Sequence, residues 1–233
     1  MIAAVVVASG SGSRFGRHEG KQLADLVGIP LVGHAMLAIE RCSDIDEVVL
    51  VCHPDSVAEF SAEVVIGLGL TKVSRVVPGG DTRQESVFAG LRVVSGEASI
   101  VVVHDGARPL VTHAIFTDAI AALRSDGSAD GVVVGHPAID TIKTVDAHGT
   151  VTGTPDRASL WVAQTPQVFR ARVLRRAHEA AESSGFTGTD DASLVERNGG
   201  VVRMVEGPRH NIKVTAPEDL VFAAALLAVR EGA

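Results

Sequence analysis

A loop rich in small residues follows the first apolar run of the chain and carries two cations. The apolar run covers residues 3–8, and Ser-Gly-Ser-Gly-Ser-Arg-Phe-Gly follows it at positions 9–16. Small residues let backbone N–H groups approach a polyanion closely. Arg14 and Lys21 add full positive charge for phosphate oxygens. The segment therefore predicts a phosphate-binding loop between a strand and a helix.

Two better-known phosphate loops do not fit these residues. A dinucleotide-binding fingerprint needs its third glycine at position 15, which is Phe15. A P-loop needs serine or threonine after its lysine, but Gln22 follows Lys21. The alternative left open is an ordinary tight turn rich in glycine and serine.

Composition narrows the class of protein. The 233 residues are 46% apolar, which suits one domain covering residues 1–233 with a substantial core. The net charge of −7 argues against binding nucleic acid or membranes through a basic surface, and no apolar run is long enough to span a membrane. Residue 1 leads straight into the first apolar run, so we expect no targeting peptide and a cytoplasmic protein. Cys42 and Cys52 match no zinc or redox spacing and are expected to be buried free thiols in a reducing compartment.

Strand and helix patterns alternate along most of the chain. Apolar, β-rich runs predict strands at residues 47–52, 72–77, 99–104, 131–135, 201–205 and 211–214. Helical patterns cover residues 32–41, 83–94, 113–124, 170–182 and 190–197, and a capping box at 215–218 opens a last helix to about residue 230. This order predicts an α/β fold with a doubly wound, mostly parallel, Rossmann-like sheet. Ligands then belong at the carboxyl ends of the strands.

One stretch breaks this alternation. Residues 141–145 and 150–152 are short β-rich runs, and the turn sequence Asp-Ala-His-Gly joins them at 146–149. Such a hairpin is too small to have its own core. We therefore expect a β-arm at about residues 138–158 that packs on another subunit, and packing on its own domain is the alternative.

Five segments hold most of the residues that could do chemistry. They cover positions 9–22, 79–87, 103–109, 140–143 with 157–169, and 189–193 with 211–215. The most specific motifs are His-Asp-x-Ala-Arg-Pro from His104, Gln-Thr-Pro-Gln from Gln164, Thr-Asp-Asp-Ala-Ser from Thr189 and Asn-Ile-Lys-Val-Thr from Asn211. Their order and spacing resemble those of the 2-C-methyl-D-erythritol 4-phosphate cytidylyltransferase family over essentially the whole chain.

The resemblance implies transfer of CMP from CTP to a sugar-alcohol phosphate, 2-C-methyl-D-erythritol 4-phosphate, with release of pyrophosphate. It also implies Mg²⁺ or another divalent cation and a homodimer whose arm reaches into the partner's site. The nucleophile is a phosphate oxygen that is already anionic, so cations rather than a general base should dominate the site.

The resemblance also implies a role for each matching position. The residues with an implied catalytic role are Arg14, Lys21 and Lys213. Nucleotide-binding positions are Ala8, Ser9, Gly10, Gly12, Gly80, Asp81, Arg83, Ser86 and Gly106. Substrate-binding positions are Asp105, Arg108, Thr141, Arg157 and Thr165, and Asp105 is also the expected metal ligand.

Several of these residues have simpler alternative interpretations. Asp105 could cap the helical region that follows it, Arg157 could form a surface ion pair, and Lys213 could be a solvated strand-edge charge. Thr165 could be only a turn residue. The pair at 190–191 is expected to favour a helix N-terminus rather than a metal.

Departures from the family pattern leave the charges in place. Ser9 replaces an alanine, Gly20 a proline, Leu23 an aromatic residue and Gly106 an alanine. Two other functions stay open: a ribitol-5-phosphate cytidylyltransferase, which shares much of the scaffold, and a nucleotide-binding module without activity.

Overall fold

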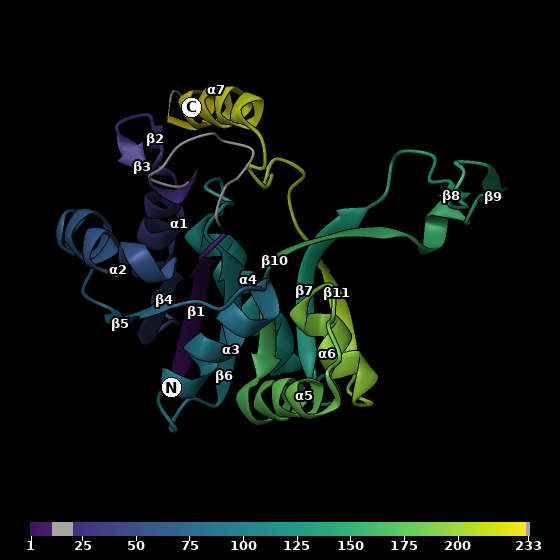
Figure 1. Cartoon of the computed structure of the whole chain (residues 1–233), viewed down its shortest axis with the longest axis horizontal. Coiled ribbons are helices and arrows are strands. Elements are labelled where there is room, and N and C mark those ends of the chain that lie inside the picture. The colour runs from purple at the N-terminus through teal and green to yellow at the C-terminus, as the bar shows by residue number, and fades with distance from the viewer. Residues whose placement is uncertain (11–20, 232–233) are drawn as a thin grey trace.

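The chain is built on a seven-stranded sheet with strand order β11-β7-β10-β6-β1-β4-β5 (Figure 1). The computed structural model describes residues 1–10 and 21–231. The strands are β1 (Ile2–Ala8), β4 (Glu47–Cys52), β5 (Val73–Pro78), β6 (Ile100–Asp105), β7 (Gly131–Pro137), β10 (Trp161–Arg170) and β11 (Val202–Glu206). All neighbouring pairs are parallel except those of β10, which runs antiparallel to β6 and β7. The expected mostly parallel α/β sheet is therefore confirmed.

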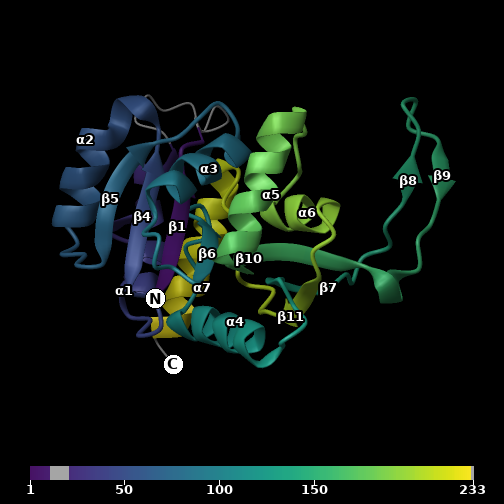
Figure 2. The same ribbon diagram turned by 90° about the horizontal axis from the view of Figure 1, so that it is seen from below.

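Helices cover both faces of the sheet (Figure 2). One face carries α1 (Leu31–Glu40), α4 (His113–Ser125) and a π-helical segment (Phe60–Ile66); the other carries α3 (Arg83–Val93), α5 (Ala171–Ser184) and α6 (Asp191–Arg197). A hydrophobic core lies between the sheet and the helices on each face. Because side chains alternate along a strand, Ala4 and Val6 of β1 pack in the core with α1 and α4, and Ala3 and Val5 pack in the core with α3 and α5. No helix in the described ranges combines the length and apolar character that a membrane crossing requires.

Short elements complete the chain. They are η2 (Lys21–Leu23), β2 (Asp25–Leu26), β3 (Ile29–Pro30), η3 (Pro54–Ser56), α2 (Val57–Glu59) and η5 (Arg157–Ser159). The last helix, α7 (Pro217–Glu231), packs on a separate small core that includes Leu26, Leu31 and Leu110.

A hairpin projects from the sheet between β7 and β10 (Figures 1 and 2). Its strands β8 (Thr144–Val145) and β9 (Val151–Gly153) are antiparallel; β8 is shorter than the sequence predicts, and β9 begins one residue later than predicted. The Asp146 carboxylate closes the turn by accepting from the backbone N–H groups of His148 and Thr150, both at 2.9 Å.

Two local predictions were wrong, and one strand was not predicted. Residues 211–214 form no strand; their backbone instead bonds to the loop after β6, with the Val214 N–H donating to the Ala107 carbonyl at 2.8 Å. The sequence did not predict β10, whose polar Gln-Thr-Pro-Gln stretch interrupts the apolar pattern of a buried strand. At the start of α7, the Asp219 carboxylate rather than Glu218 accepts from the N–H and hydroxyl groups of Thr215.

Candidate active site

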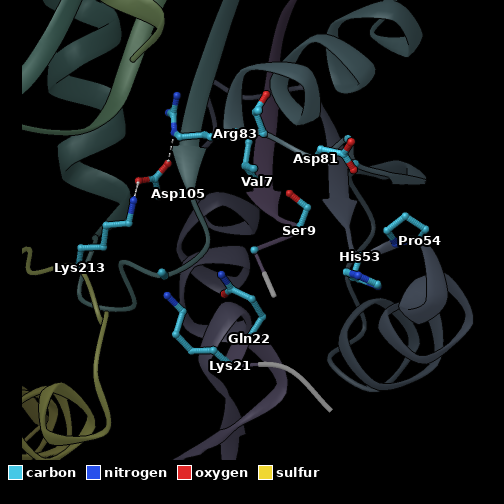
Figure 3. Close-up of a pocket in the computed structure, with 15 residues that line it drawn as sticks. Val7, Ser9, Lys21, Gln22, His53, Pro54, Asp81, Arg83, Asp105 and Lys213 are labelled. Atoms are coloured by element: carbon cyan, nitrogen blue, oxygen red, sulfur yellow. Dashed lines mark hydrogen bonds and ion pairs between the residues drawn. The ribbon is translucent and has the colours of Figure 1, made fainter. Parts of the chain in front are cut away.

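A cavity of about 480 Å³ opens at the carboxyl ends of four adjacent strands. Ser9 follows β1, His53 follows β4, Gly79 follows β5, and Asp105 is the last residue of β6. This is where a doubly wound sheet is expected to hold a ligand. The lining residues are Val7, Ser9, Gly10, Lys21, Gln22, His53, Pro54, Gly79, Gly80, Asp81, Thr82, Arg83, Asp105, Ala107 and Lys213 (Figure 3).

Asp105 is held between two cations. Arg83 Nε donates to Asp105 Oδ1 at 2.9 Å, and Lys213 Nζ donates to Asp105 Oδ2 at 2.7 Å (Figure 3). Burial opposes the charged carboxylate, but the two cations outweigh it and hold the pKa of Asp105 well below its usual range. An ionised carboxylate is therefore fixed at the cavity wall beside two groups that can bind phosphate oxygens.

Arg83 also extends this network into the protein interior. Its Nη1 donates to Oδ2 of Asp191 at 2.8 Å, and Oδ1 of Asp191 lies 3.0 Å from Nε2 of His178. Asp191 and His178 are both buried. Burial disfavours the guanidinium charge, but Asp191 and Asp105 outweigh it and raise the pKa of Arg83. The orientation of Arg83 is thus fixed from both ends of its guanidinium group.

Lys21 approaches the cavity from η2. Its Nζ donates to the Val214 carbonyl at 2.8 Å, next to Lys213 in sequence. The neighbouring Gln22 is buried, and its Oε1 has no hydrogen-bond partner in the part of the chain that the structure describes. The predicted cations Lys21 and Lys213, 192 positions apart in the chain, thus line one cavity.

The opposite side of the cavity is built from backbone and hydroxyl groups. Ser9 Oγ donates to Ser86 Oγ at 2.7 Å, and the Gly80 N–H donates to Ser86 Oγ at 3.2 Å. A Cβ on Gly79 would lie 2.6 Å from both Ser9 Cβ and Ser86 Oγ, so only glycine allows this approach. Thr82 accepts from the Glu85 N–H and caps α3, which begins at the cavity.

Thr165 is buried and contacts the backbone of Asp105 rather than the cavity. Its Oγ1 accepts from the Asp105 N–H at 3.0 Å and lies 3.1 Å from His104 Nδ1. Burial lowers the pKa of His104 to about 3, so this imidazole is neutral near pH 7. The Thr165 hydroxyl can then donate to His104 while it accepts from Asp105. Its predicted contact with substrate stays a prediction.

The remaining predicted residues occupy different places. Ala8 is the buried last residue of β1, and Gly106 donates its N–H to the Val7 carbonyl at 2.9 Å. Arg108 lies beside the cavity wall, where its Nη1 donates to the Asn211 carbonyl at 2.7 Å. Burial, only partly offset by Asp105, lowers the pKa of Arg108. None of these residues lines the cavity.

Thr141 and Arg157 lie on the arm or at its base and do not line this cavity. Both are exposed, and Arg157 Nη1 donates to the Ile139 carbonyl at 2.7 Å. Gly12 and Arg14 lie outside the described residues.

The structure adds residues that the sequence reasoning did not assign to the site. His53, Pro54, Gln22 and Thr82 line the cavity, and the strand-end rule that predicted Asp105 could also have found His53 after β4. The pair at 190–191 does sit at a helix N-terminus, where Asp190 caps α6. Asp191, however, pairs with Arg83, and no local pattern reveals such a long-range contact.

Comparisons with known proteins agree with this geometry. The family model described as "IspD: 2-C-methyl-D-erythritol 4-phosphate cytidylyltransferase" matches residues 2–229. Proteins of that name from Geotalea uraniireducens and Pelotomaculum thermopropionicum are each 43% identical, over 97% and 99% of this chain and 96% of each relative. The crystal structure of 4-diphosphocytidyl-2C-methyl-D-erythritol synthase from Anaerococcus prevotii has a TM-score of 0.86 and 30% identity, covering 98% of this chain and 96% of that one.

These matches cover nearly the whole chain and include the segments that form the cavity. They confirm the resemblance predicted from the sequence motifs and the assignment as a nucleotidyltransferase enzyme. The chain belongs to the 2-C-methyl-D-erythritol 4-phosphate cytidylyltransferase (IspD) family.

Proposed function

We propose that this chain carries out its family's reaction, the transfer of CMP from CTP to 2-C-methyl-D-erythritol 4-phosphate in isoprenoid precursor synthesis, in the cavity at the carboxyl ends of β1, β4, β5 and β6. The observation that carries the proposal is the placement of Asp105 between Arg83 and Lys213, with Lys21 on the same cavity wall. The cations suit a reaction in which two phosphates must meet and negative charge must be stabilised, and the ionised carboxylate suits a metal ion that shares this role.

Lys21, Lys213 and Arg14 are the proposed catalytic cations. The attacking phosphate oxygen of the acceptor is already anionic, so the site needs no strong base. Lys213 and Lys21 would instead neutralise charge that develops as the bond to the α-phosphate forms and the bond to pyrophosphate breaks. Among the residues that the structure describes, the lining contains two lysines and one arginine, which is consistent with these proposed roles.

Asp105 is the proposed protein ligand of Mg²⁺. Magnesium is usually held by one or two carboxylates together with substrate phosphates and water, rather than by an all-protein cage. The donor set fits that mode, because Asp105 and Asp81 are the only carboxylates among the cavity-lining residues described. In agreement, no cluster of three or more metal-binding side chains occurs within residues 1–10 and 21–231. When bound, the metal would neutralise phosphate charge; the chain's part is to keep Asp105 ionised and oriented.

The nucleoside is proposed to bind opposite these cations. Ser9, Gly10, Gly80, Asp81 and Ser86 provide backbone and hydroxyl groups there. Ala8, Gly12, Arg83 and Gly106 complete the proposed nucleotide-binding set.

We also propose a homodimer in which Thr141 and Arg157 bind the acceptor phosphate in the partner's site, with Arg108 and Thr165 assisting from within the chain. The support is that Thr141 and Arg157 do not line their own chain's cavity, while the arm and its base expose large apolar side chains. These are Ile139, Ile142, Val145, Val151, Trp161 and Val162, each at least 38% exposed. A twofold contact would cover this surface reciprocally.

A cytoplasmic location is the accompanying proposal. Cys42 and Cys52 are both buried free thiols, as expected in a reducing compartment.

The test is a comparison of acceptors. Pyrophosphate release from CTP is measured with 2-C-methyl-D-erythritol 4-phosphate and with ribitol 5-phosphate, each with UTP in place of CTP as a control. The proposal expects a clear preference for CTP and the methylerythritol acceptor. A preference for ribitol 5-phosphate would assign the related cytidylyltransferase activity, and no turnover with either acceptor would favour a binding module.

A further inference from the structure

The cavity has two chemically different sides. Figure 3 shows Arg83, Asp105 and Lys213 on one side, and Asp81, His53 and Pro54 on the other. Phosphates belong with the cations, so a nucleotide bound as proposed above must direct its nucleoside toward the second side. This step rests on the proposed function, because it takes CTP as the ligand.

His53 occupies the rim of the nucleoside side rather than its floor. It directly follows Cys52, which pairs in register with Ala8 of β1, so His53 is the β4 counterpart of Ser9. Ser86, within hydrogen-bonding distance of Ser9 and Gly80, is fully buried, whereas the His53 side chain is 48% exposed. A flat base fits against the glycine-lined floor, and the rim then meets the more solvated part of the nucleoside, its ribose.

The hydrogen bonding of the imidazole defines what it can offer. His53 Nδ1 accepts from the Asp55 backbone N–H at 3.3 Å, at the start of η3. A neutral imidazole that accepts at Nδ1 carries its proton on Nε2. Nε2–H is therefore a donor, and it lies on the ring edge opposite the contact with η3.

We infer that His53 binds the ribose of the nucleotide, with Nε2–H donating to a ribose hydroxyl oxygen. Neither the motifs nor the family resemblance assigns a role to this residue. His53 would then be a specificity-determining residue that favours ribonucleotides over deoxyribonucleotides, while contributing little to the chemistry at the phosphates.

The test measures dissociation constants by calorimetry in the presence of Mg²⁺ for CTP, 2′-deoxy-CTP and 3′-deoxy-CTP. The variants are His53→Phe, which keeps a ring without a donor, and His53→Gln, which keeps an N–H group. His113→Phe removes an exposed histidine on α4 and is the matched control. Thermal unfolding of each variant verifies that it is folded.

His53→Phe is expected to weaken CTP binding by about three- to tenfold, the effect of one neutral hydrogen bond. The same substitution should change binding of at least one deoxynucleotide by less than about twofold, since the contact is already absent there. His53→Gln should lose less affinity for CTP than His53→Phe, and His113→Phe should lose none.

Equal losses for CTP and both deoxynucleotides, or no loss for CTP, would overturn the inference. Pyrophosphate release by the unsubstituted protein is measured separately. A failure of the proposed function would appear in that assay. It would not change the ratio of the dissociation constants for CTP and the deoxynucleotides.

Discussion

Lys213 and Asp105 join the last irregular segment of the chain to the end of a central strand. Lys213 Nζ donates to Asp105 Oδ2 at 2.7 Å, although the two residues are 108 positions apart. The contact places a cation and an ionised carboxylate at one point of the cavity. It links two of the four motifs that carry the family resemblance, His-Asp-x-Ala-Arg-Pro and Asn-Ile-Lys-Val-Thr.

Replacing Lys213 by alanine is expected to impair turnover far more than folding. The side chain is 40% exposed, so its loss removes little core packing, but it removes a charge facing the reacting phosphates. We expect kcat to fall on the order of a hundredfold or more. Steady-state kinetics and thermal unfolding provide the measurement, and Arg124→Ala, which breaks an exposed ion pair with Asp44, is the control. Near-normal turnover in folded Lys213→Ala protein would assign Lys213 to the solvated surface.

Asp191→Ala is expected to reduce the free energy of unfolding by about 3 kcal/mol, because it removes the buried carboxylate that pairs with Arg83 Nη1 and contacts His178, although Arg83 keeps its pair with Asp105. Glu182→Ala is the matched control, because it also removes a carboxylate that pairs with an arginine of α3. It breaks the exposed Arg92–Glu182 pair and should cost less than about 1 kcal/mol. Urea titration of both variants gives the comparison. Equal losses would mean that the Arg83–Asp191 contact contributes no more than a surface pair.

The stability of the protein is expected to fall as the pH drops below about 6.5, in part because of His104. Its pKa is lowered to about 3 in the folded chain from 6.5, so the unfolded chain binds the proton first. Stability therefore rises with pH across this window, by at most about 1.4 kcal/mol per pH unit from this group. The depressed pKa values of Asp105 and Asp191 add a further loss below about pH 4.

The measurement is the free energy of unfolding at several pH values between about 6 and 4. His104→Gln should give a shallower slope than the unsubstituted protein, and His113→Gln, which removes an exposed histidine, is the control. Parallel curves for all three proteins would contradict a buried neutral His104.

A mixture of Arg157→Ala and Lys213→Ala proteins should regain activity that neither has alone. If each site takes Arg157 from one subunit and Lys213 from the other, a mixed dimer carries one site with both residues intact. Random exchange should then restore roughly one quarter of the unsubstituted activity. No recovery after demonstrated subunit exchange would reject the shared site, and a monomer in sedimentation analysis would reject the arm interface as well.

The sequence predicted the centre of the sheet well because the parallel strands β1, β4 and β6 are buried on both faces. Continuous runs such as residues 100–105 need no long-range information to be recognised. The strand β10 could not be found in this way. Its register shifts between Ala163 and Gln167, and the polar side chains of Gln164 and Gln167 bond to residues distant in sequence, Asn211 and Asp190.

The residues of the candidate site were likewise predictable only in part. Strand-end position favoured the loop of Lys21 and Asp105 as site residues, and the family resemblance implied Lys213; all three line the cavity. The partners of Arg83 were not predictable, because its two carboxylates come from β6 and α6. Only the three-dimensional packing of α3 on β1, β4 and β5, next to α5 on the same face of the sheet, brings them together.

The most direct test of the central claim is formation of 4-diphosphocytidyl-2-C-methyl-D-erythritol, measured by mass spectrometry alongside pyrophosphate release. The purified protein is incubated with CTP, Mg²⁺ and 2-C-methyl-D-erythritol 4-phosphate, in parallel with Lys21→Ala protein. The account predicts equal amounts of the two products, formed on the order of a hundredfold or more slowly by the variant. Release of CMP without the diphosphocytidyl product, or equal rates for the two proteins, would contradict it.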